Sequence, residues 1–552
     1  MATEDELAER RAKWRARHGQ PLDVEQHGPD LVALIERIAA AENLSPDEVS
    51  QLLARYPRGG RELFAKDQLV RSYRELLARG AVTPSRETLA RLRAKPTRTL
   101  SGVAPVTVLT KPFPCPGECI FCPEFSSMPK SYLPDEPGAL RAEQLKFDPY
   151  LQTALRMQAL ENIGHNTDKV ELLILGGTWS YYPADYQEWF IRRCLDAMNG
   201  EDSATLKVAQ RRNETAPHRN VGLVVETRPD YIDQAEVIRL RRLGVTKVQI
   251  GVQSMDEDIL FHNKRGHTVE QTRQAFRLLR AGGFKIHAHW MPNLLGATPD
   301  SDRADFARLW DDPALRPDEL KIYPCSLMAD TELYRRWQNG EYRPYTDQEL
   351  IDLIADCKAH VPPYCRINRV MRDIPAGHVV AGSTRSNLRE IVQRVMRKRG
   401  KHCQCIRCRE VRGEKVNAEA LVLQELAYDT DTTAEHFLAF VTPEPGRGHA
   451  GPLLAGFLRL SLPREQGLLE EIAGAAMIRE VHVYGPALEI GVESVGLAQH
   501  AGLGTRLIER GTEIAREAGF KRLAVIAATG TRNYYRVRGF ERGELYMVRD
   551  IS

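Results

Sequence analysis

No run of the 552-residue sequence stays apolar for the roughly 18 residues that a membrane-spanning helix needs, which argues against a membrane protein. The first thirty residues also lack the apolar core of a secretory signal, so we expect a cytoplasmic protein without a membrane partner. Extreme composition is absent too: hydrophobic residues make up 42% and charged residues 27%, which excludes a mainly disordered or collagen-like chain. In a reducing cytoplasm, clustered members of the ten cysteines are better explained as metal ligands than as disulfides.

A large net charge is lacking as well, because 77 Lys and Arg face 74 Asp and Glu, but the balance is uneven along the chain. Residues 51–100 carry twelve basic and four acidic residues, and residues 364–412 carry thirteen and three. Two strongly cationic segments in a nearly neutral chain indicate a polyanionic partner that binds at a defined site. The alternative for each segment is a solvated helix face.

The length predicts three or four domains, and the sequence pattern divides into four regions. Residues 1–95 have helical periodicity and a basic second half. Residues 96–362 alternate short β-rich runs with helical stretches, which predicts a parallel βα architecture whose functional residues follow the strands. The expected strands are 103–109, 169–175, 221–227, 245–251, 284–290 and 319–324. A basic linker is expected over 363–412, and a smaller α+β domain over 413–552.

The string KPFPCPGECIFCPE places three cysteines directly after the first expected strand: Cys115, Cys119 and Cys122. Three thiolates at this spacing can hold three irons of a [4Fe–4S] cluster, which leaves the fourth iron open to a substrate or cofactor. A structural zinc site that lacks one ligand is the alternative.

The second expected strand ends in Gly176, Gly177 and Thr178, and small residues there let the backbone approach a bound amino-acid group. With the cysteine spacing, this resembles the radical S-adenosylmethionine (SAM) superfamily, whose partial (β/α)6 barrel carries its cluster after the first strand. The resemblance implies that SAM binds the open iron through its methionine part and is reductively cleaved to a 5′-deoxyadenosyl radical. Three strand-end residues would line the same cavity, unless they are only polar strand caps: Glu226, Gln253 and Asn293.

Near the C-terminus, the string QHAGLGT (499–505) precedes a helical stretch. Glycines at a helix start expose N–H groups that bind a pyrophosphate, although an ordinary strand-to-helix turn has the same pattern. With the strand expected at 477–485 and the string GTRNYYRVRGF (530–540), the region resembles the GNAT acetyltransferase fold. The resemblance implies an acetyl-CoA site with a tyrosine near the thioester. Tyr534 and Tyr535 match that tyrosine, and the alternative for both is aromatic packing in the core.

A radical-SAM barrel joined to an acetyltransferase domain resembles one family, the catalytic subunit of Elongator, a tRNA uridine carboxymethyl synthase. The resemblance covers most of residues 90–552, and the cysteine spacing is short, as in bacterial members. Strings that carry it include PKSYLPDEPGALRA (129–142), DKVELLILGGT (168–178), KRGHT (264–268) and REVHVYG (479–485). The implied activity converts the wobble uridine of tRNA to 5-carboxymethyluridine: the 5′-deoxyadenosyl radical activates the acetyl methyl group of acetyl-CoA, the carbon radical adds to C5, and hydrolysis releases CoA.

The resemblance also carries over the family's acetyl-CoA contacts, which would place the acyl chain at the junction of the two catalytic domains. These contacts fall on Lys169, Glu480, Val481, His482, Val483, Gln499, Gly502, Leu503, Gly504, Thr505 and Tyr535. The catalytic candidates among the matched positions are Lys169, Tyr534 and Tyr535. From the sequence alone, a lysine before a strand is usually a solvated flank.

A third constellation, KHCQCIRCREVR, holds Cys403, Cys405 and Cys408 in the most basic stretch of the chain. Three thiolates so close in sequence favour a Zn2+ site, and the arginines around them could hold RNA phosphates. Reduced cysteines without a metal are the alternative. The fourth ligand stays open, with Cys365 and Cys325 as candidates that only the fold could bring near.

The sequence therefore predicts an α/β multidomain enzyme that uses a [4Fe–4S] cluster, SAM and acetyl-CoA to modify tRNA, either alone or as a homodimer. Two rivals remain: a protein lysine acetyltransferase with a structural iron–sulfur cluster, and a non-catalytic tRNA-binding scaffold. The basic segments suit RNA better than basic protein tails, which speaks against the first. Retention of both sets of site residues speaks against the second.

Overall fold

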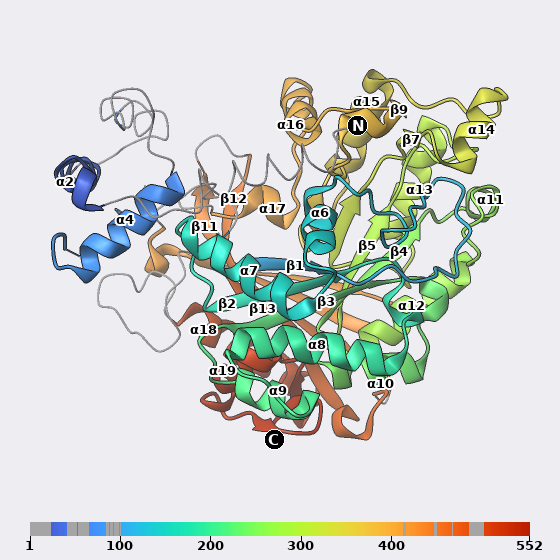
Figure 1. The fold of residues 1–552 in the computed structure, drawn as a ribbon. Coiled ribbons are helices and arrows are strands. Elements are labelled where there is room, and N and C mark those ends of the chain that lie inside the picture. The colour runs from blue at the N-terminus through green and yellow to red at the C-terminus, as the bar shows by residue number, and fades with distance from the viewer. Residues whose placement is uncertain are drawn as a thin grey trace. The chain divides into compact units, whose positions relative to one another are not determined.

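The computed structural model of the chain describes residues 24–40, 66–83, 101–411, 416–446, 450–465, 467–484 and 502–552, together with residues 52, 88, 92 and 99 (Figure 1). The chain divides into two compact units. Residues 1–104 with 155–167 form the first unit, and residues 105–154 with 168–552 form the second. In the described part of the chain, no helix combines the length and the apolar character that crossing a membrane would require.

The first unit contains helices α2 (Val24–Ala40) and α4 (Lys66–Ala78), which pack on each other through apolar side chains. The stripe that the sequence predicts on α2 is buried: Leu31, Leu34, Ile35 and Ile38. On α4, Leu69, Val70, Tyr73 and Leu76 complete this core. The basic residues Arg74 and Arg79 face solvent, and the later basic residues of this segment, from Arg86 to Lys95, lie outside the described residues.

The second unit begins with a seven-stranded sheet in the order β1-β2-β3-β4-β5-β6-β8. From β2 onward the neighbouring strands run parallel, as the alternation of strands and helices predicts. The strands are β1 (Ala104–Leu109), β2 (Lys169–Leu175), β3 (Arg219–Thr227), β4 (Lys247–Gln253), β5 (Lys285–Trp290), β6 (Glu319–Ile322) and β8 (Arg366–Arg369). Six of them match the strands expected from the sequence, and the parallel βα architecture is confirmed.

Helices cover the barrel strands, with α8 packed on β3 and α12 on β5 (Figure 1). The helices of residues 137–409 are α6 (Pro137–Gln144), α7 (Pro149–Asn162), α8 (Ala184–Asn199), α9 (Leu206–Asn213), α10 (Gln234–Leu243), α11 (Glu257–His262), α12 (Val269–Ala281), α13 (Pro299–Asp311), α14 (Glu332–Gln338), α15 (Asp347–Ala359), α16 (Leu388–Lys398) and α17 (Ile406–Arg409). A small two-stranded sheet joins β7 (Leu327–Met328) to β9 (Val379–Ala381). Helix α9 lies in a polar segment between two of the expected strands, and its Leu206 and Ala209 are buried.

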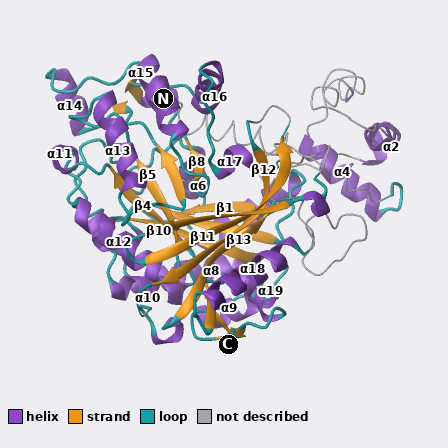
Figure 2. Cartoon of the chain, turned by 180° about the vertical axis from the view of Figure 1, so that it is seen from behind, coloured by secondary structure: helices purple, strands orange, loops and turns teal. Residues whose placement is uncertain are grey.

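A second seven-stranded sheet, in the order β10-β11-β12-β13-β14-β16-β15, forms the C-terminal part of this unit (Figure 2). Its strands are β10 (Val422–Asp429), β11 (Thr433–Pro445), β12 (Pro452–Pro463), β13 (Ala475–Val483), β14 (Arg522–Val525), β15 (Glu541–Arg542) and β16 (Met547–Asp550). Only β13 and β14 pair in parallel, and helix α18 (Leu503–Glu517) lies between them in the chain. The short helix α19 (Arg532–Arg536) follows β14. This is the smaller α+β block that the sequence predicts.

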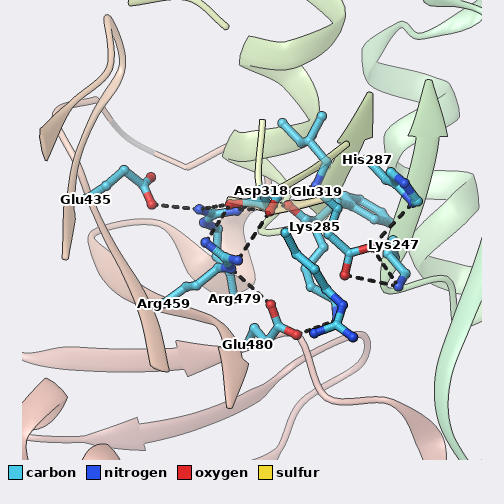
Figure 3. A network of polar contacts seen from close by, with 12 residues as sticks. Lys247, Lys285, His287, Asp318, Glu319, Glu435, Arg459, Arg479 and Glu480 are labelled. Atoms are coloured by element: carbon cyan, nitrogen blue, oxygen red, sulfur yellow. Dashed lines mark hydrogen bonds and ion pairs between the residues drawn. The ribbon is translucent and has the colours of Figure 1, made fainter. Parts of the chain in front are cut away.

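Buried ion pairs join the two sheets of the second unit (Figure 3). Arg479 of β13 donates to both carboxylate oxygens of Asp318, just before β6, at 2.5 and 2.8 Å, and to Glu435 of β11 at 2.7 Å. Glu480 accepts from Lys285 of β5 at 2.8 Å and from Arg459 of β12 at 2.9 Å. These contacts seat β13 against the amino ends of β5 and β6.

We predict that Asp318→Asn lowers the free energy of unfolding by about 3–5 kcal/mol at pH 7, because it removes the buried carboxylate that pairs with Arg479 through both oxygens and leaves Glu435 as the remaining partner of that guanidinium. Burial alone would raise the pKa of Asp318, but Arg479 and Arg459 hold it down to about 2. The contribution is therefore complete above the unfolded-state pKa of about 4 and is lost as the pH falls toward 2. Urea unfolding followed by circular dichroism at pH 7 and pH 3 measures it.

The matched control is Asp429→Asn, which removes an exposed partner of Arg464 and should change stability little. An Asp318→Asn variant with the urea midpoint of the wild type at pH 7 would contradict this account of the interface.

Candidate functional site

The loop that follows β1 carries the first three cysteines. Cys119 is buried, and its Sγ accepts a hydrogen bond from Nη1 of Arg265 at 3.0 Å. Cys115 Sγ lies 3.7 Å from the hydroxyl of Thr178, the residue that ends the Gly-Gly-Thr string. The structure thus brings the predicted cluster loop and the predicted methionine-binding turn together at the carboxyl ends of β1 and β2.

Two buried arginines lie beneath this loop, and neither is among the residues that the sequence predicts. Arg228 follows β3 and pairs with Asp230 at 2.9 Å, and a methyl group at Gly117 would lie 2.2 Å from its Nη1. A hydrogen bond from Cys122, and then the charges of Arg265 and Arg228, hold the pKa of Cys119 well below its ordinary value against the effect of burial. The guanidinium groups favour the thiolate form of the cysteines and would balance the negative charge of a cluster bound to them. The signal in the sequence is a charged residue directly after a buried strand.

The Gly-Gly-Thr turn needs its glycines for shape. Gly176 and Gly177 have φ values of 144° and 95°, and a Cβ on Gly176 would lie 1.8 Å from the hydroxyl of Thr110. Tyr182 donates a hydrogen bond to the carbonyl of Gly176 at 3.0 Å and holds the turn against β1. A ligand that lies beside the cysteine loop can therefore approach the backbone of this turn closely.

The three predicted strand-end residues differ in their surroundings. Glu226 lies 3.5 Å from Tyr132 and 3.5 Å from His289. Gln253 has a φ of 67°, and its buried Oε1 has no hydrogen-bond partner among the described residues. The amide of Asn293 is already engaged, because it donates to the carbonyl of Cys325 and accepts from the backbone of Tyr345. Glu226 and Gln253 thus keep polar atoms available inside the barrel, whereas Asn293 fixes a loop.

The predicted acetyl-CoA strand has an open edge. β13 pairs with β14 only over Ala475–Ile478, whereas on its other side it pairs with β12 as far as Val483. Glu480, Val481, His482 and Val483 therefore lie on the stretch where the two parallel strands separate. Helix α18 starts beside the end of this stretch: Gly502 has the left-handed conformation and is followed by Leu503, Gly504 and Thr505, and a Cβ on Gly504 would lie 3.8 Å from a methyl group of Val483. Gln499 lies outside the described residues.

The paired tyrosines occupy different positions beside this helix. A Cβ on Gly504 would lie 2.3 Å from the hydroxyl of Tyr534, so this ring lies directly on the predicted pyrophosphate turn. Arg538 stacks on the same ring at 3.6 Å and donates to the hydroxyl of Thr505 at 2.9 Å. Tyr535 is buried, and its ring contacts Phe540 edge-on. A cation and the start of a helix thus converge on one turn, which suits a phosphate group.

Lys169 lies near the junction of the two sheets. It is the first residue of β2 and pairs in register with Arg219 of β3. A methyl group at Gly530, in the string that leads to the tyrosines, would lie 2.5 Å from the Cβ of Arg219. Burial lowers the pKa of Lys169. The lysine is thus not a solvated flank.

The string that leads to the tyrosines is tied to the barrel by one carboxylate. Glu214, at the end of α9, pairs with Arg532 and Arg536 at 3.1 Å and with Arg542 at 3.0 Å. Asn533 also donates to its backbone carbonyl. Helix α19 is therefore held against the barrel by charge.

The second cysteine triad forms a compact group. The sulfurs of Cys403, Cys405 and Cys408 all lie within 4.8 Å of one another, which fits three donors of a single zinc ion. The buried Nζ of Lys358 has no hydrogen-bond partner among the described residues and acts electrostatically on Cys403, so an anionic thiolate centre would balance its charge.

Neither candidate for a fourth zinc ligand joins this group of sulfurs. The backbone carbonyl of Cys365 accepts from Ile406 at 2.9 Å, beside Cys405. Cys325 belongs to an apolar cluster with Leu294 and Leu327.

Two family descriptions match the chain: the Radical SAM superfamily over residues 114–309, and the Radical_SAM C-terminal domain over residues 317–398. Membership of this superfamily implies a [4Fe–4S] cluster and SAM, and the first cysteine triad lies within the matched range.

Curated relatives cover most of the chain. A tRNA uridine(34) acetyltransferase of Methanocaldococcus jannaschii is 42% identical over 83% of this chain and 86% of its own length. That of Dehalococcoides mccartyi is 43% identical over 83% of this chain and all of its own length, 100%. Elongator complex protein 3 of Homo sapiens is 36% identical over 84% of this chain and 87% of its own. A solved structure of the archaeal Methanocaldococcus infernus Elp3 with an N-terminal deletion superposes with a TM-score of 0.70 and 38% identity, over 81% of this chain and 99% of that one.

We predict that replacing Cys115, Cys119 and Cys122 together by Ala abolishes both cluster binding and SAM cleavage, because no thiolate remains to hold iron. The C-terminal sheet should stay folded, since none of the three lies in it. Iron and sulfide content after anaerobic reconstitution, and 5′-deoxyadenosine formed after reduction, are the measurements. Cys194→Ala, which removes a buried thiol from α8, is the control and should keep both properties. Undiminished SAM cleavage in the triple variant would refute the assignment.

Proposed function

This chain belongs to the family of tRNA uridine(34) acetyltransferases and Elongator complex protein 3, and we propose that it forms 5-carboxymethyluridine at the wobble uridine of tRNA, using acetyl-CoA, in the cytoplasm. The observation that carries the proposal is the seating of β13, the predicted acetyl-CoA strand, on the barrel strands β5 and β6. The same barrel holds the cysteine loop at its other end. Acetyl-CoA and SAM would then be bound at the two ends of one buried interior.

Each predicted site residue has a role in this proposal. When bound, the cluster supplies the electron that cleaves SAM. Gly176, Gly177 and Thr178 would hold its methionine part, with Glu226 and Gln253 facing the rest. On the second sheet, the turn at Gly502–Thr505 would bind the pyrophosphate of acetyl-CoA through free N–H groups, and the open edge of β13 would bind its extended chain. Tyr534, Tyr535 and Lys169 would orient the thioester end.

A basic helix supports tRNA as the partner. In α16, Leu388, Val392 and Met396 are buried, whereas the opposite face is exposed. Arg394, Arg397 and Lys398 lie on that face and form no ion pair within the described residues. Cations held on a rigid helix without acidic partners are suited to phosphate contacts. A Zn2+ ion on Cys403, Cys405 and Cys408 would fix the segment that follows this helix.

Two rival functions make different predictions. A protein lysine acetyltransferase would transfer the acetyl group to an amine and would have no need to cleave SAM. A tRNA-binding scaffold would release no CoA. The contacts that hold β13 to the barrel favour neither rival, because both could work with the two sheets apart.

We predict that the purified protein releases CoA slowly from acetyl-CoA alone and faster when tRNA is added, because RNA binding energy positions the thioester for reaction. Lys169→Ala and Tyr535→Phe should lower the tRNA-stimulated rate by roughly 10-fold or more while leaving tRNA affinity nearly unchanged, since neither side chain lies in a basic segment. CoA release and nucleoside mass spectrometry of the tRNA, with SAM and a reductant present, are the measurements.

Lys207→Ala, which removes a lysine from the surface of α9, is the control for Lys169→Ala. Acceleration by lysine-containing peptides instead of tRNA would favour the protein acetyltransferase. Wild-type protein that leaves no carboxymethyl group on uridine would refute the proposal.

We also predict that replacing Arg394, Arg397 and Lys398 by Gln weakens tRNA binding and reduces the slope of log affinity against log salt by about two to three. Each phosphate contact that is lost means that about one fewer counterion is released on binding. Binding isotherms between 50 and 200 mM salt, a range in which such slopes are about linear, measure it. The control is the double substitution of Arg385 and Arg399 by Gln. These arginines already pair with Asp347 and Asp352, so the slope should change less. An unchanged slope in the triple variant would exclude these phosphate contacts.

A further inference from the structure

Three neighbouring barrel strands place polar side chains at alternate positions, pointing into the barrel. They are Lys247 and Gln249 of β4, Lys285, His287 and His289 of β5, and Glu319 and Lys321 of β6. All but Lys285 are buried, in strands that are otherwise apolar. Buried polar groups are costly unless they are paired or used, so this set calls for a role.

Glu319 and His287 form a pair at the centre of this set (Figure 3). Nδ1 of His287 lies 3.3 Å from Oε2 of Glu319. The carboxylate also accepts from Nζ of Lys247 at 3.1 Å and from Nδ2 of Asn368 at 2.6 Å, so its position is fixed from three sides. Both ring nitrogens of His287 are buried without a hydrogen bond among the described residues, and Nδ1 is the one that lies near the carboxylate. A proton on Nδ1 would face the carboxylate and leave the lone pair of Nε2 free.

The pair lies next to the second sheet. Glu319 directly follows Asp318, which binds Arg479 of β13. His287 is two positions along β5 from Lys285, which binds Glu480 of β13. The barrel contains a second histidine–carboxylate pair, His289 with Glu226, but Glu226 contacts Tyr132 of the segment after the cysteine loop. Of the two pairs, His287 with Glu319 is therefore the one at the level of the predicted acetyl-CoA strand.

We propose that His287, oriented by Glu319, is the general base that hydrolyses the thioester joining CoA to the modified uridine. This inference rests on the proposed function. If CoA is held on the C-terminal sheet and the uridine enters the barrel, the thioester between them must lie at the junction of the two, where this pair is found. Hydrolysis needs a base at that bond, and neither the cysteine loop nor the pyrophosphate turn supplies one.

The chemistry needs only water as co-reactant. Nε2 takes a proton from a water molecule, whose oxygen attacks the thioester carbonyl carbon. The carbon–sulfur bond then breaks, and the sulfur leaves as CoA thiol with the proton returned by the imidazolium, while the acyl carbon becomes the carboxyl group on uridine. Glu319 stabilises the transient imidazolium.

The surroundings suit this step. Burial, and then the charges of Lys321 and Lys247, lower the pKa of His287 well below its ordinary value, so the ring is neutral at pH 7 and is a weak base whose imidazolium readily gives its proton to the leaving sulfur. The same two ammonium groups are placed to stabilise the negative charge that develops on the carbonyl oxygen during attack.

A double-label experiment tests the proposal. Holoenzyme with a reconstituted cluster is mixed with SAM, reductant, tRNA and acetyl-CoA that carries one label in the acetyl group and another in the CoA adenine. In wild type, tRNA should carry the acetyl label alone. In His287→Gln, 5′-deoxyadenosine should form as in wild type, whereas both labels should stay on the tRNA in equal amounts and CoA release should slow by about 100-fold or more. Glu319→Gln should also retain both labels, with a smaller slowing.

The matched control is His436→Gln, which disrupts another histidine–glutamate pair, 2.7 Å from Glu425 at the outer edge of the C-terminal sheet, and should behave as wild type. Release of CoA by His287→Gln at the wild-type rate would overturn the proposal, as would loss of 5′-deoxyadenosine formation, which would assign His287 to an earlier step or to folding. If the wild-type protein left no acetyl label on tRNA, the proposed function itself would be refuted, and His287 would have no thioester to hydrolyse.

Discussion

The pair between Asp318 and Arg479 fixes the position of the C-terminal sheet on the barrel. Both side chains are buried, so neither charge can be separated from the other without a cost of several kcal/mol, on the order of 3–5. Glu435 accepts a further N–H of the guanidinium, and Lys285 binds the next residue of the strand, Glu480. Each of these bonds has a direction, and together they define the register of β13 over β5 and β6. An apolar interface of the same area would allow more sliding.

Most of the fold could be predicted from the sequence because the barrel strands are short, apolar and rich in β-branched residues. β8 could not, since its sequence RINR (Arg366–Arg369) is polar and only its position beside β6 makes it a strand. Helix α9 was hidden for a similar reason: its segment is mostly polar, and its buried Leu206 and Ala209 face a neighbour that the sequence does not reveal. In both cases tertiary contacts overrode local composition.

In the candidate site, too, some residues could be predicted from the sequence and others could not. The cysteine triads, the Gly-Gly-Thr turn and the glycines before α18 are contiguous in sequence, so their spacing alone indicates chemistry. Arg265 and Cys119 lie in separate loops, and His287 and Glu319 lie on separate strands, so only the fold brings each pair together. The alternation of polar residues in FKIHAHW (284–290) was nevertheless visible, because a buried parallel strand should be apolar on both faces.

Glu214 sets a limit on how this architecture can be rearranged. A single carboxylate at the end of α9 collects three guanidinium groups from the last quarter of the chain, Arg532, Arg536 and Arg542. A designer who grafted a different acyltransferase block onto this barrel would leave that carboxylate beside unrelated side chains, and one who transplanted the block would carry three cations with no acceptor. The two catalytic parts can therefore not be exchanged independently of each other. Recombination between relatives would have to keep α9 and the C-terminal segment from the same parent.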